Sequence, residues 1–86
     1  MPANDLVATV RSIVAATLGA ADPPAADARA REVAGWDSHA TVQIIFAIED
    51  HFGFEMTGEE MESIDSVASI VAIATRRTAM SMPARS

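Results

Sequence analysis

Apolar residues recur at helical spacing in three stretches of the chain, and residues that start or stop helices bound each stretch. In the first stretch, residues 5–18, apolar side chains return every three or four positions, which predicts a helix with one apolar face. Gly19 follows it, and glycine readily adopts the positive φ with which many helices end. Two consecutive prolines then exclude a continuation, so a long loop is expected to about Trp36.

The second predicted helix begins at Asp37 or Ser38, because either side chain can accept a hydrogen bond from an amide of the first turn. It runs to Phe52 and ends at Gly53. Its apolar stripe is expected to contain Thr41, Ile45, Ile48 and Phe52, with Val42 and Ile44 on the flanks. Phe46 lies about 120° from the centre of that stripe, so this aromatic side chain is expected on the solvent side.

A short acidic stretch, residues 58–64, is predicted to form one or two helical turns. Thr57 can cap its start, and Glu60, three residues later, completes the pattern of a capping box.

The final helix is predicted to begin at Asp65 or Ser66 and to end near Thr78. Arg76 and Arg77 would then stand near its negative end, where cations are favourable. Its core-facing residues are expected to be Val67, Ile70, Val71 and either Ile73 or Ala74. Three longer helices, one short helix and no strand pattern predict an all-α four-helix bundle, with one domain over residues 1–78 and a flexible tail over residues 79–86.

The composition excludes several classes of function. A domain of 86 residues buries only about 60–65 % of the surface that its unfolded chain exposes, which disfavours a deep catalytic cleft. Without cysteine there is no disulfide, thiolate metal site or cysteine nucleophile. No apolar run approaches the roughly 20 residues of a membrane span, and no basic signal-peptide start is visible. A cytoplasmic monomer without membrane contact is therefore expected.

The charge points to basic partners. The net charge is -6, lysine is absent, and nine of the twelve acidic residues lie between Glu32 and Asp65, a stretch without Arg or Lys. Nucleic-acid binding needs clustered cations, so it is not expected. The negative charge between residues 32 and 65 should instead attract basic protein surfaces.

The residues that could carry chemistry are Asp37, Ser38 and His39, which taken alone are typical of an ordinary helix cap. A hydrolase triad is disfavoured, because neighbours on a helix point in different directions and no Gly-x-Ser-x-Gly turn surrounds the serine. His39 and His51 are twelve residues apart on one helix and cannot share a metal ion. The acidic residues after position 58 lack calcium-loop spacing, so a solvated face is favoured over a metal site.

Residues 35–38, the amphipathic helix after them and the following Gly-Phe pair resemble the acyl carrier protein family over about residues 5–75. The resemblance implies that Ser38, with Asp37 beside it, receives 4′-phosphopantetheine covalently from coenzyme A. The chain would then be a carrier that holds an acyl group as a thioester, and not an enzyme. An exposed hydroxyl at a helix N-terminus suits a phosphodiester, because unpaired amides and the positive helix end face it.

By the same resemblance, the partner-facing residues match His39, Val42 and Phe46, with Glu49 and Asp50 supplying charge. The implied partners are a phosphopantetheinyl transferase and a loading ligase, synthase or transferase with basic docking patches. The alternative for Phe46 is that it covers the loop before the helix.

Two residues depart from the pattern of fatty-acid biosynthesis carriers: His39 stands in place of leucine and Gln43 in place of glutamate. Together with residues 56–64, they favour a specialised pathway, polyketide-like or loading small hydroxyacyl or aminoacyl groups. Trp36 stands where peptidyl carriers usually have a second glycine. An aminoacyl or D-alanyl carrier remains an alternative, as does an unmodified interaction module that has kept the carrier fold.

Overall fold

The computed structural model describes the backbone of residues 3–81 and the side chains of residues 5–78. Its elements are α1 (Ala3–Leu18), a 3-10 turn η1 (Ala30–Glu32), α2 (Ser38–Phe52), α3 (Gly58–Glu62) and α4 (Val67–Ser81). Over residues 3–81, β-structure is limited to one isolated bridge. The predicted all-α fold with three longer helices and one short helix is confirmed.

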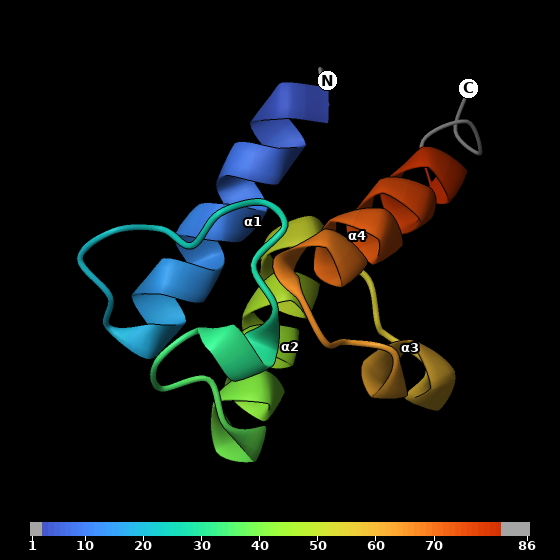
Figure 1. The fold of residues 1–86 in the computed structure, drawn as a ribbon. Helices are drawn as coiled ribbons and strands as arrows, with labels where there is room; N and C mark the ends of the chain where they lie inside the picture. The colour runs from blue at the N-terminus through green and yellow to red at the C-terminus, as the bar shows by residue number, and fades with distance from the viewer. Residues whose placement is uncertain (1–2, 82–86) are drawn as a thin grey trace.

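The three longer helices form the body of the molecule, and α3 lies to one side of it (Figure 1). Helices α1 and α4 both contact α2, and they also contact each other. The first turn of α2 lies at the opposite end of the bundle from the start of α1 (Figure 1). Helix α1 runs toward that same end, so the long loop between α1 and α2 leaves from it and returns to it (Figure 1).

Local signals set three helix boundaries as predicted: the C-terminal ends of α1 and α2 and the start of α3. Gly19 and Gly53 both have a positive φ, 69° and 76°, and the Gly53 amide donates to the carbonyl of Glu49 at 2.8 Å. Thr57 and Glu60 form the predicted capping box, in which each side chain accepts a hydrogen bond from the other residue's amide. The sequence predicts these helix boundaries because the interactions that form them span only three or four residues.

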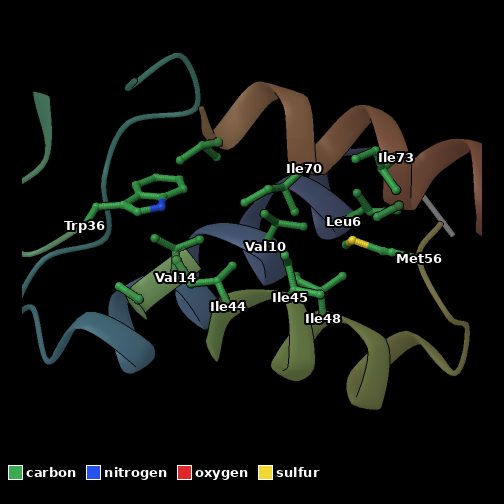
Figure 2. Packing of buried hydrophobic residues seen from close by; sticks show 13 residues of the cluster. Leu6, Val10, Val14, Trp36, Ile44, Ile45, Ile48, Met56, Ile70 and Ile73 are labelled. Atoms are coloured by element: carbon green, nitrogen blue, oxygen red, sulfur yellow. The ribbon is translucent and has the colours of Figure 1, made fainter. Parts of the chain in front are cut away.

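The core fills the space between the three longer helices. Its largest fully buried side chains are Ile44, Ile48, Ile70, Val10, Val14 and Val67. Figure 2 shows core side chains such as Val14, Ile44, Ile48 and Ile70 between Trp36 at one end and Met56 at the other. Of the residues predicted to face the core from α4, Val67 and Ile70 are buried, and so are both Ile73 and Ala74. Val71, also predicted there, is only half-buried against the core.

The buried face of α2 is rotated from the predicted stripe. Ile44, expected on its flank, is fully buried, and Ala40 is buried with it. Thr41 and Phe52, expected inside the stripe, are only half-buried, and Val42 is exposed. Because α2 packs against both α1 and α4, its buried face is set by the groove between those helices rather than by its own apolar spacing.

The loop before α2 contains structure that local patterns did not predict. The amide of Ala30 donates to the carbonyl of Asp65 at 2.8 Å, and the amide of Val67 donates to the carbonyl of Ala28 at 3.0 Å. This antiparallel bridge fastens the loop to the segment that starts α4.

Two features at the C-terminal end differ from expectation. Helix α4 continues to Ser81, past the predicted end at Thr78, and residues 82–86 of the predicted tail lie outside the described residues. Arg76 and Arg77 are therefore not in the last turn of α4. Both instead form ion pairs with Glu60, at 2.9 and 2.8 Å.

The Glu60 carboxylate ties α3 to α4. The amide of Thr57, together with the two arginines, holds the pKa of Glu60 below its ordinary value, against the effect of partial burial. Arg77 also donates to the carbonyl of Glu55 at 2.9 Å, and its guanidinium lies 5.1 Å from the centre of the Phe54 ring.

In residues 3–81 no helix is long and apolar enough to cross a membrane.

Candidate functional site

Ser38 is the first residue of α2, and its side chain is exposed. The cap is Asp37, whose Oδ1 accepts from the amide of Ala40 at 2.8 Å, while its carbonyl accepts from the amide of Thr41 at 2.9 Å. Within residues 3–81, the Ser38 hydroxyl and the amides of Ser38 and His39 have no hydrogen-bond partner. The helix head thus presents a free hydroxyl beside unpaired amides.

Hydrogen bonds hold the residues that lead into the N-terminus of α2. Gly35 has a φ of 85°, which glycine adopts without steric cost, and its carbonyl accepts from the amide of Asp37 at 3.1 Å. The indole of Trp36 is buried, and its Nε1 donates to Oγ1 of Thr41 at 2.9 Å. Sequence reasoning missed this bond, because spacing alone placed Thr41 in the apolar stripe.

His39 lies next to Ser38 on the exposed surface. Its Nε2 is 3.1 Å from Nε2 of Gln43, one turn further along α2. His51 lies at the opposite end of the helix, with its ring edge against Phe52. In the part of the chain that the structure describes, no group of three or more His, Asp or Glu side chains is arranged to hold a metal ion.

The outward face of α2 carries the two large exposed hydrophobic residues of the described chain, Val42 and Phe46, at 47 % and 61 % exposure. The solvent position predicted for Phe46 is confirmed. Phe46 lines a shallow hollow over the end of α2, the segment after it and α4. The other residues around this hollow are Glu49, Asp50, Gly53, Phe54, Glu55 and Arg77.

The two acids predicted to supply charge to partners have different surroundings. Glu49 is half-buried, and its Oε2 accepts from the amide of Met56 at 2.8 Å. Asp50 is exposed. The carboxylate of Glu49 therefore serves the fold, while that of Asp50 faces solvent.

Most of the chain matches a known protein family. The model described as "Phosphopantetheine attachment site" matches residues 8–74, which run from within α1 to within α4. The chain belongs to the acyl carrier family of phosphopantetheine-binding proteins. An acyl carrier protein of Akkermansia muciniphila is 41 % identical to it over 73 residues, which cover 84 % of this chain and 91 % of that protein.

As a family member, the chain is a carrier protein whose cofactor is covalently bound 4′-phosphopantetheine. Acyl carriers interact with a phosphopantetheinyl transferase and with acyl-handling enzymes, and the carriers themselves are not catalysts. The exposed, unpaired hydroxyl at the head of α2 and the two unpaired amides beside it suit a phosphodiester link to such an arm.

Proposed function

We propose that Ser38 is the residue that carries 4′-phosphopantetheine, and that the chain delivers acyl thioesters to partner enzymes. The observation that carries the proposal is the exposed Ser38 hydroxyl, which has no hydrogen-bond partner in residues 3–81 and lies inside the span matched by the family model. It needs no rearrangement of the helix to become reachable.

Modification is a phosphoryl transfer from coenzyme A. The Ser38 oxygen forms a bond to the phosphorus next to pantetheine, the pyrophosphate bond breaks, and adenosine bisphosphate leaves. The hydroxyl proton passes to a base of the transferase, because no side chain of the described residues hydrogen-bonds the Ser38 hydroxyl. Asp37 stays bonded to Ala40 and keeps the helix head in place.

The bound arm supplies a terminal thiol that holds the acyl group as a thioester. The chain's own contribution is to anchor the phosphate. The unpaired amides of Ser38 and His39 and the positive end of α2 face the place where that phosphate would lie. A tethered thioester reaches each partner at high effective concentration, so a weak and repeated contact suffices.

The partner surface we propose is the exposed face of α2. Val42 and Phe46 offer apolar contact, His39 stands beside the attachment point, and Asp50 offers charge to a basic patch. Glu49 contributes to the field of this face, although one of its oxygens is engaged by Met56. Such contacts between exposed charges weaken as salt rises.

We place the carrier in a specialised pathway, polyketide-like or handling small hydroxyacyl or aminoacyl groups. The pair His39 and Gln43, which bond to each other on the exposed surface, supports this proposal. His39 stands where fatty-acid biosynthesis carriers have leucine, and Gln43 stands where they have glutamate, at the start of the exposed face of α2. An aminoacyl or D-alanyl carrier would use the same attachment.

The test is modification in vitro. Incubation with coenzyme A, magnesium and a broad-range phosphopantetheinyl transferase should add the mass of one arm, and Ser38→Ala should add none. Ser12→Ala is the matched control, because Ser12 is exposed on α1, and it should be modified like the wild type. Modification of the Ser38→Ala protein would move the attachment elsewhere.

A further inference from the structure

We propose that Trp36 and Thr41 form a positioning pair that holds the Ser38 hydroxyl in place for modification. The inference rests on the proposed attachment at Ser38. Trp36 Nε1 donates to Thr41 Oγ1 at 2.9 Å, and Thr41 Oγ1 donates to the carbonyl of Asp37 at 3.1 Å. Ser38 lies inside the short loop of chain that these two bonds close.

One end of the pair is fixed in the core. The Trp36 side chain is only 7 % exposed and belongs to the buried cluster, where it lies near Val14 and Ile44 (Figure 2). Its backbone amide also donates to the carbonyl of Val33 at 3.2 Å. A ring held in this way is a rigid reference point, because packed interiors leave side chains little freedom.

The other end is the first turn of the helix that bears Ser38. The first amides of a helix have no partner one turn back, so this turn frays most easily. Asp37 restrains it through the amides of Ala40 and Thr41, and both of these bonds lie within the turn itself. The bond from Trp36 to Thr41 is different, because it connects the turn to the core across Ser38.

This connection should matter for the transfer step rather than for docking. Phosphoryl transfer needs the attacking oxygen aligned with the bond that breaks, and a displacement of about 1 Å can cost up to about a hundredfold in rate. The exposed docking residues Val42 and Phe46 are not part of the pair. Loss of the pair should therefore lower the kcat of modification and leave KM nearly unchanged.

The variants are chosen to separate positioning from folding. Thr41→Val keeps the shape of the side chain but removes the hydroxyl, and it leaves the indole N–H unpaired. Trp36→Phe combined with Thr41→Val removes donor and acceptor together, so no buried polar group is orphaned. Thr41→Ser restores the hydroxyl. The matched control is Thr17→Val in α1, because Thr17 Oγ1 also bonds a carbonyl four residues back, at 2.9 Å.

The experiment measures kcat and KM for arm transfer by a broad-range transferase, together with unfolding in urea to show that each variant is folded under the assay conditions. Both Thr41→Val and the double variant should lose about tenfold in kcat with KM within about twofold. Thr41→Ser should recover most of the rate, and Thr17→Val should match the wild type.

Folded variants with wild-type kcat, or with a raised KM and unchanged kcat, would overturn the positioning role while leaving Ser38 as the attachment residue. A wild-type protein that gains no arm would instead overturn the proposed function, and the inference with it. Amide hydrogen exchange at Ala40 and Thr41 gives a readout independent of transfer, and it should quicken in Thr41→Val.

Discussion

The Glu49 carboxylate accepts a hydrogen bond from the backbone amide of Met56, 2.8 Å away, and so joins the last turn of α2 to the segment that leads to α3. Met56 is itself buried at one end of the core (Figure 2). An acid that sequence alone places on the partner surface thus also holds the turn after α2. Stability and partner binding can therefore be separated at neighbouring acids.

Glu49→Gln should lower the free energy of unfolding by about 1 kcal/mol, because a charge-assisted bond to Met56 becomes a neutral one. Urea unfolding at neutral pH measures it. Asp50→Asn removes one negative charge from the next, exposed position and should change stability by less than about 0.5 kcal/mol. Equal losses in the two variants would assign the effect to charge near the helix end rather than to the bond.

Stability should fall in acid because of Glu60. Its pKa is lower in the folded protein than its ordinary value of 4.5, since the Thr57 amide and the two arginines favour the carboxylate. The unfolded chain therefore takes up this proton first as the pH falls. The contribution of Glu60 is present above pH 4.5 and is lost as the pH drops through the lower, folded pKa.

Urea unfolding of Glu60→Gln at pH 7 and at several values below 4.5 tests this. At pH 7 the free energy of unfolding of the variant should be lower than that of the wild type by more than about 0.5 kcal/mol, the size of an ordinary surface effect. This difference in stability should become smaller in acid. Glu59→Gln, exposed on the same short helix, should keep the wild-type pH dependence. A gap that stays constant with pH would contradict the assignment.

Phe46→Ala should weaken docking without weakening the fold. Phe46 is 61 % exposed, so its truncation should cost less than about 0.5 kcal/mol of stability. An exposed aromatic at a contact can carry much of the binding energy, so KM for the transferase should rise about tenfold with kcat unchanged. Phe52→Ala, half-buried in the same helix, should show the reverse: lower stability and normal KM. An unchanged KM in Phe46→Ala would remove Phe46 from the transferase contact.

The sequence predicts those parts of the structure that depend on near neighbours. The cap at Asp37, the glycine after α2 and the capping box of Thr57 with Glu60 involve residues at most four apart, so residue type and spacing suffice. The exposure of Phe46 also follows from helical spacing alone.

What the sequence does not predict depends on residues that meet only in the folded chain. Arg76 and Arg77 were expected to stabilise the end of their own helix, but they bind Glu60, sixteen and seventeen residues away. Ile44 is fully buried because α2 packs against both α1 and α4, and the spacing within α2 cannot show how those helices are placed. The Trp36 bond to Thr41 is local in sequence, yet it depends on a core that holds the ring.

The bridge between the loop before α2 and the start of α4 has a consequence for the order of biosynthesis. The amides of Ala30 and Val67 form the two bonds of this bridge, to the carbonyls of Asp65 and Ala28. Residues 65–67 are synthesised well after Ser38. Because chains emerge from the N-terminus onward, Ser38 is made before the loop that leads to it can be fastened. A transferase that requires an ordered first turn of α2 would therefore act only after residues 65–67 have been synthesised and have paired with the loop.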